Sequence, residues 1–150
     1  MKTAVQTDNF RLFKEALKSD CHGVRFGSEF CEHLLPSLGV LEKAYELAHE
    51  EEKEFTYVTP RLSNAGIEKI REQFLFLSEK GEVSVVVNDF GALNVLSHYP
   101  NLRPQLGRNL FLVPARSAWA EGYIQSHEPS SEIGRWARDL YSTTSLNYEA

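Results

Sequence analysis

Four charged side chains follow the predicted strands of this sequence, and together they could form a chemical site. Glu29 and Asp89 each supply a carboxylate, and Arg61 and Arg108 each supply a guanidinium. An arginine binds a carboxylate or phosphate through two parallel hydrogen bonds, whereas a nearby carboxylate can orient a substrate hydroxyl or act as a general base. We therefore predict a site for a small anionic or polar ligand, with Glu29 and Asp89 as its catalytic residues.

Two further residues belong to the same candidate site. Asn88 directly precedes Asp89, and Cys31 lies shortly after Glu29. We assign both, with the two arginines, to substrate binding. A structural interpretation has equal weight at this point: Asp89 caps a helix, the arginines pair with neighbouring carboxylates, Glu29 is solvated and Cys31 is a small buried hydrophobic residue.

Parallel strands would bring these residues to one edge, and four segments have the composition of strands. They are rich in β-branched and aromatic residues and comprise residues 23–26, 54–58, 83–87 and, less clearly, 102–106. Apolar residues at helical spacing predict one helix before the first strand, starting after Asp8, and helices between the strands, starting near residue 38, after Ser63 or Asn64, and at residues 89–98. The first three strands recur at intervals of about 30 residues, the length of a strand, a crossover helix and a parallel strand. The predicted fold class is α/β.

Two details refine this expectation. Residues 83–87 are almost wholly apolar, which is typical of a parallel strand covered on both faces. Pro104 cannot donate a ladder hydrogen bond, so the fourth segment is expected to be an edge strand, irregular, or displaced to residues 110–113.

Charge and hydropathy exclude several classes of partner. The net charge of -5 provides no positive field for phosphate backbones, so we expect no binding to duplex nucleic acid. No apolar run approaches the ~20 residues of a membrane span, and the N-terminal residues lack the pattern of a signal peptide. We expect a cytoplasmic protein that does not bind membranes, with Cys21 and Cys31 as free thiols.

No cofactor or metal is expected. The pairs Cys21-His22 and Cys31-x-His33 stand on opposite sides of a strand, and four residues at ~3.3 Å each exceed the ~2.3 Å of a Zn–S bond several-fold. A glycine-rich phosphate loop is also absent from the sequence.

Four segments, in this order and spacing, resemble the N-terminal barrel half of the collagenase-like peptidase superfamily, which also holds hydroxylases of ubiquinone synthesis and of RNA bases. They are GVRFGSEFCEHLLP, FTYVTPRLSNAGIEKI, VSVVVNDFGALNVL and LRPQLGRNLF. The third is similar to a strand of the family that ends in N-D-x-G-x-L, and the fourth to the family's glycine-centred turn. The resemblance covers residues 8–113 and implies a TIM-type barrel, which needs about 250 residues when complete.

The resemblance thus implies half of a barrel, with about four parallel strand–helix units and an aromatic C-terminal segment. It also implies hydrolase, specifically peptidase, or hydroxylase ancestry. The residues do not choose between these activities, because no recognisable proteolytic motif occurs and the two cysteines cannot supply the four-cysteine iron–sulfur site of the hydroxylases. Whether the chain is an enzyme is left open.

We expect one domain over residues 1–150, with a half-barrel core at 8–113 and a helical or irregular segment at 114–150. An open parallel sheet leaves two edges with unpaired backbone groups. We therefore predict a homo-oligomer, a partner that completes the barrel, or an edge covered by the chain beyond Val113. The alternative function is a non-catalytic subunit that assembles with itself or with a cluster-bearing partner. A third interpretation is a fragment of a longer polypeptide.

Overall fold

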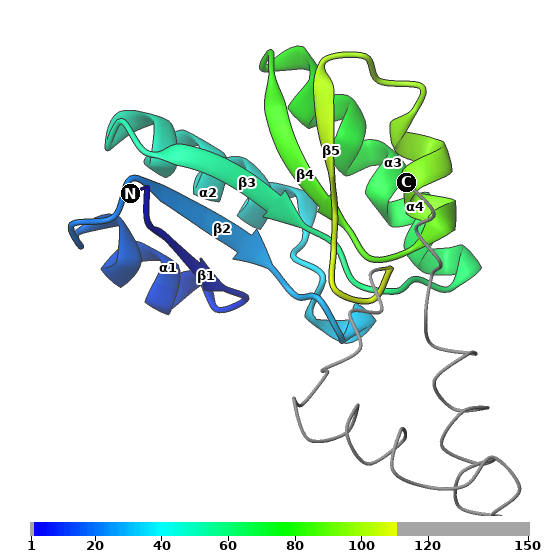
Figure 1. Ribbon diagram of the computed structural model, residues 1–150, viewed down its shortest axis with the longest axis horizontal. Coiled ribbons are helices and arrows are strands. Elements are labelled where there is room, and N and C mark those ends of the chain that lie inside the picture. Colours follow the sequence, from blue (N-terminus) through cyan, green and yellow to red (C-terminus); the bar gives the residue numbers. More distant parts are fainter. Residues whose placement is uncertain (1, 111–150) are drawn as a thin grey trace, which may run out of the picture. The chain divides into compact units, whose positions relative to one another are not determined.

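The computed structural model describes residues 2–110, which form a five-stranded, wholly parallel β-sheet and four α-helices (Figure 1). The strands are β1 (Ala4–Thr7), β2 (Gly23–Gly27), β3 (Glu54–Val58), β4 (Val83–Val87) and β5 (Leu102–Leu106). The helices are α1 (Phe10–Leu17), α2 (Leu38–Glu50), α3 (Asn64–Glu79) and α4 (Phe90–Leu96), with a short 3₁₀ helix η1 (Glu32–Leu34) after β2. The α/β class and the four predicted strands are confirmed.

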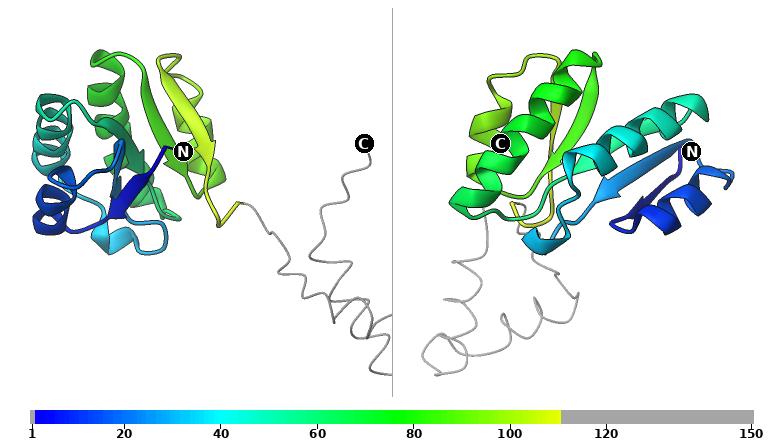
Figure 2. Two further views of the ribbon diagram at one scale, coloured as in Figure 1. Left: turned by 60° about the vertical axis from the view of Figure 1, so that its left-hand side comes forward. Right: turned by 180° about the vertical axis from the view of Figure 1, so that it is seen from behind.

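The strands lie in the sheet in the same order as in the sequence, β1-β2-β3-β4-β5. Each connection therefore returns across the sheet and starts the next strand beside the previous one. Side chains from one face of the sheet pack with residues of all four helices in a single hydrophobic core, so these helices cover the same face (Figure 2). The core residues on the strands are Val24, Phe26, Phe55, Tyr57, Val83, Val85, Val87 and Leu102.

The opposite face of the sheet is more polar. A single register row crosses all five strands there and consists of Gln6, Arg25, Thr56, Ser84 and Arg103. Ser84 therefore interrupts the apolar run of β4 on the side away from the helices. The sequence predicts that β4 is covered on both faces. On the face away from the helices, this is true of Val86, which is buried, but not of Ser84, which is half-buried.

The sheet begins earlier than the sequence predicts. β1 lies before the expected core start at residue 8, and its four residues are exposed or half-exposed, so no burial pattern marks it in the sequence. The first helix is capped by Asn9 instead of Asp8, because Asn9 Oδ1 accepts hydrogen bonds from the backbone N–H groups of Arg11 and Leu12 at 2.9 and 3.3 Å. The prediction of Asp8 as the cap is wrong by one residue.

Other boundary predictions are confirmed. Ser63 caps α3 through a 3.3 Å hydrogen bond from the backbone N–H of Gly66. β5 contains Pro104 and pairs only with β4 among the strands of the described region, as expected of an edge strand. The predicted segment 114–150 and residues 111–113 lie outside the described residues.

Candidate functional site

The carboxyl ends of β2 and β5 meet through an ion pair between two predicted site residues. Arg108 Nε donates a hydrogen bond to Glu29 Oε2 at 2.6 Å. The Glu29 side chain is only 8% exposed, whereas that of Arg108 is 72% exposed. The buried carboxylate thus binds the Nε edge of an exposed guanidinium. The Nη groups of Arg108 take no part in this hydrogen bond.

This contact agrees with a curled sheet. In a flat sheet β2 and β5 would be three strand spacings of about 4.8 Å apart. Asn109 Nδ2 also donates to the backbone carbonyl of Glu29 at 2.7 Å, so two consecutive residues after β5 contact the loop after β2. A cavity on the face away from the helices is lined by residues of three strands, Arg25 on β2, Thr56 on β3 and Gln105 on β5. This shared lining also agrees with a curled sheet.

Asn88 connects the ends of three strands. Its side chain is buried, its Nδ2 donates to the backbone carbonyl of Thr59 at 2.9 Å, and its Oδ1 accepts from the backbone N–H of Asn109 at 3.0 Å. Gly107 lies so close that an added Cβ would overlap the Asn88 amide. Glycine at position 107 therefore lets the chain after β5 approach Asn88 and turn toward Glu29.

Asp89 acts as the N-cap of α4. Its Oδ1 accepts from the backbone N–H groups of Gly91 and Ala92 at 2.6 and 3.2 Å, and its Oδ2 accepts from that of Leu62 at 3.4 Å. This carboxylate stabilises the first turn of α4 and joins it to the loop after β3. Arg61, in that loop, has an exposed side chain.

The loop after β2 is shaped by Gly27 and Ser28. Gly27 has a φ of 127°, and an added Cβ would overlap the backbone carbonyl of Val58, so only glycine fits this turn before Glu29. Ser28 Oγ accepts from the backbone N–H of Cys31 at 3.3 Å, and the Cys31 side chain is half-buried.

An exposed aromatic residue of the same loop contacts the arginine. The Cζ atom of Arg108 lies 5.1 Å from the ring centroid of Phe30, which is 66% exposed. Such a cation–π contact leaves the edges of the guanidinium plane able to bind a planar anion.

Glu32 links η1 to the start of α3. Its carboxylate accepts from the hydroxyl of Ser63 at 2.7 Å and from the backbone N–H of Ser63 at 2.8 Å. These two hydrogen bonds hold the pKa of Glu32 below its usual range.

The structure therefore brings together only some of the predicted site residues. Glu29 and Arg108 contact each other, and Asn88 joins them through Asn109. Within residues 2–110, no hydrogen bond or ion pair connects the side chains of Arg61 or Cys31 to the Glu29–Arg108 pair. The structural interpretation is confirmed for Asp89 as a cap and for the pairing of Arg108, but Glu29 is buried instead of solvated.

Sequence reasoning did not select two residues of this site, Asn109 and Phe30. Asn109 had a recognisable signal, because it follows the glycine-centred turn after β5, where an amide side chain can hydrogen-bond backbone groups. Phe30 had none, since its exposure and its contact with Arg108 depend on the curl of the sheet.

No group of three or more His, Cys, Asp or Glu side chains in the described part of the chain could hold a metal ion. Among the helices of the same part, none is both long and apolar enough to cross a membrane. Comparison of the chain with protein-family models found no match, and comparisons with curated proteins and with solved structures found none either.

Proposed function

We propose that this chain binds a small carboxylate or phosphate at the carboxyl end of its parallel sheet, with Arg108 as the principal ligand-binding residue. The observation that carries the proposal is the unequal exposure of the Glu29–Arg108 pair. Glu29 is nearly inaccessible and accepts from Nε, so it orients Arg108 while the exposed Nη groups can still donate hydrogen bonds to a ligand. In parallel α/β folds, ligands bind at this end of the strands.

The proposed architecture is part of a TIM-type barrel, in keeping with the resemblance to the collagenase-like peptidase superfamily. The consecutive strand order and the helices on one face support it, since both are properties of such barrels. The contact between residues after β2 and β5 supports it further, because a sheet must curl to close.

The catalytic part of the proposal rests on Glu29 and Asp89, and the two have different surroundings. Both oxygens of Asp89 accept backbone hydrogen bonds, which favours a positioning role. Glu29 is nearly inaccessible and bonds to Arg108, so its role in this proposal is to position the guanidinium that binds the ligand. Hydrolysis or hydroxylation is suggested by the resemblance alone.

Thermal melts with candidate ligands test the binding proposal. Inorganic phosphate and succinate should raise the melting temperature of the full chain, and Arg108→Ala should abolish that rise. Arg11→Ala, which breaks an exposed ion pair with Glu15 on α1, is the matched control and should keep the rise. A rise of the same size in Arg108→Ala and in the unmodified chain would contradict the proposal.

A second candidate function is assembly with a copy of the chain or with a partner that completes the barrel. It is favoured by β1 and β5, which form the two edges of the sheet within residues 2–110 and present backbone groups to a further strand. In this alternative the chain is a non-catalytic subunit or interaction module.

A further inference from the structure

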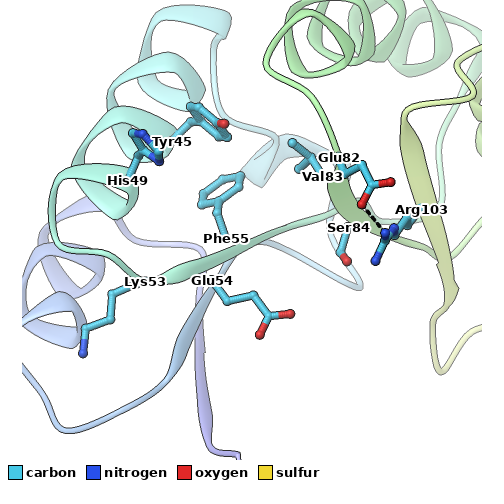
Figure 3. Close-up of a pocket in the computed structure, with 9 residues that line it drawn as sticks. All are labelled: Tyr45, His49, Lys53, Glu54, Phe55, Glu82, Val83, Ser84 and Arg103. Carbon is cyan, nitrogen blue, oxygen red and sulfur yellow. Dashed lines mark hydrogen bonds and ion pairs between the residues drawn. The ribbon is translucent and has the colours of Figure 1, made fainter.

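A cavity of about 230 Å³ opens at the amino end of the sheet (Figure 3). The Glu29–Arg108 pair lies at the opposite, carboxyl end of the strands. It lies between the beginnings of β3 and β4 and extends to α2 and β5. Its lining residues come from all four elements and the turns before them: Tyr45, His49, Lys53, Glu54, Phe55, Glu82, Val83, Ser84 and Arg103.

The cavity exists because β3 and β4 diverge. β2 pairs with β3 from Glu54 onward, but β3 pairs with β4 only from Thr56 and Ser84 onward. Phe55 and Val83 would be the next pair toward the amino end, and they lie on opposite sides of the opening. Figure 1 shows the two strands separating at this end.

One wall of the cavity is aromatic. The ring of Tyr45 packs edge-on against that of Phe55, with centroids 5.5 Å apart, and stacks on the ring of His49 at 6.3 Å. Phe55 is 9% exposed, so it is a fixed part of the core. Figure 3 shows these three side chains on one side of the opening. This wall suits an apolar side chain or an aromatic ring.

The other wall carries one positive and one negative group side by side. Arg103 Nη2 donates to Glu82 Oε2, and the hydroxyl of Ser84 lies beside them. The side chains of Arg103 and Glu82 are 66% and 67% exposed, so their pairing contributes little stability and both groups can take a further partner. The pair occupies a single nitrogen of the guanidinium and a single oxygen of the carboxylate.

The two other charged residues of the lining, Lys53 and Glu54, also carry opposite charges. Lys53 Nζ donates to the backbone carbonyls of Ser19 and Cys21 at 3.1 and 2.6 Å, and Glu54 pairs with Lys2 at 3.4 Å. The charges offered to a molecule in the cavity are therefore balanced, with a guanidinium and a carboxylate adjacent to each other and an apolar wall opposite.

We propose that this cavity binds a free α-amino acid with an aromatic or branched apolar side chain. The ligand's carboxylate bonds to Arg103, its ammonium bonds to Glu82, and its side chain packs against Tyr45 and Phe55. The size agrees, because the cavity is smaller than the ~300–1,000 Å³ of pockets for drug-sized ligands. A simple anion would meet the charge of Glu82, and a simple cation would meet that of Arg103.

Calorimetric titration of the full chain with L-phenylalanine and L-leucine tests the proposal. We expect at least one of them to bind with a Kd of about 1 mM or tighter. 3-Phenylpropionate lacks the ammonium and phenethylamine lacks the carboxylate, so, measured in Arg108→Ala to remove the other carboxylate site, each should bind at least about tenfold more weakly than L-phenylalanine. No binding of either amino acid up to about 10 mM, or equal binding of the analogues, would overturn the proposal.

Variants locate the binding. Arg103→Gln and Glu82→Gln should each weaken amino-acid binding by about tenfold or more. Arg71→Gln is the matched control, because Arg71 forms a comparable exposed pair with Glu68 on α3 and should bind like the unmodified chain. Binding that survives Arg103→Gln but is lost in Arg108→Ala would assign the heat to the other end of the sheet and refute this site, while leaving the proposed function intact.

Discussion

At the scale of single residues, the Glu29–Arg108 pair combines a structural and a binding property. Glu29 is buried and Arg108 is exposed, so their removal has different consequences. Losing the exposed partner leaves a buried acceptor without its charged donor, whereas losing the negative charge leaves an arginine that water can solvate. The two residues can therefore be separated experimentally by stability and by binding.

We predict that Arg108→Ala lowers the free energy of unfolding by about 1–3 kcal/mol, the cost of leaving a buried acceptor unsatisfied. Glu29→Gln should cost less, since the amide oxygen still accepts from Arg108 Nε. Urea denaturation of the two variants checks this. A larger loss of unfolding free energy for Glu29→Gln than for Arg108→Ala would contradict the expectation that the buried Glu29 depends on Arg108 more than Arg108 depends on Glu29.

The pKa of Glu32 predicts a pH effect. Hydrogen bonds from Ser63 lower this pKa in the folded chain, so the carboxylate stabilises the fold above the unfolded-state pKa of about 4.3. That contribution is lost as the pH falls through the lower, folded-state pKa. In urea melts, the stability difference between the unmodified chain and Glu32→Gln should be largest near pH 7 and should shrink below about pH 4. A difference that grows on acidification would be contrary to this sign.

At the scale of elements, helix α3 is attached to the sheet by a buried hydrogen-bond chain. Tyr57 Oη on β3 donates to Gln73 Oε1 at 2.5 Å, and Gln73 Nε2 donates to the backbone carbonyl of Pro36 at 2.7 Å. Burial raises the pKa of Tyr57, so the phenol stays protonated and remains the donor. The chain joins β3, α3 and the segment before α2.

We expect Tyr57→Phe to lower the free energy of unfolding by about 1–3 kcal/mol, because Gln73 Oε1 then lacks its donor in the core. Tyr99→Phe is the control, since its hydroxyl makes a 3.5 Å contact with the backbone carbonyl of Arg71 at an exposed position. That variant should change stability by less than about 0.5 kcal/mol. Equal losses in the two variants would argue against the importance of the buried chain.

The turn after β5 gives a prediction at the same scale. Gly107→Ala places a Cβ into the Asn88 amide and should lower stability by about 1–3 kcal/mol. Gly39→Ala in α2 is the control, because its Cβ would meet nothing within 4 Å and alanine favours the helix. Chemical denaturation compares the two. A Gly107→Ala variant as stable as Gly39→Ala would disprove the close approach.

The elements were largely predictable from the sequence, but the contacts of the site were only partly so. β3 and β4 are recognisable because β-branched and aromatic residues concentrate in them, and Ser63 marks the start of α3. β1 was missed because a short exposed edge strand has no burial pattern. The Glu29–Arg108 contact joins residues 79 positions apart and depends on the curl of the sheet, which no local pattern encodes.

At the scale of the whole molecule, the open edges of the sheet predict self-association. β1 is an edge strand within residues 2–110, and Val5 on it is 39% exposed. Light scattering on the full chain should give a mass above that of one chain at micromolar concentration, and Gln6→Pro should reduce it by removing a backbone donor from the edge. A strict monomer in both would leave assembly through β1 without support.

The proposed function depends on the binding of a small anion by Arg108 at the carboxyl end of the sheet. Two-dimensional ¹H–¹⁵N NMR of the full chain titrated with inorganic phosphate tests it most directly, with the Nε–H signal of Arg108 assigned by its loss in Arg108→Ala. We expect saturable shifts of this signal and of the backbone amides of Phe30 and Asn109, with little change at Arg103. Shifts confined to the amino end of the sheet, or no saturable shift at Arg108, would contradict it.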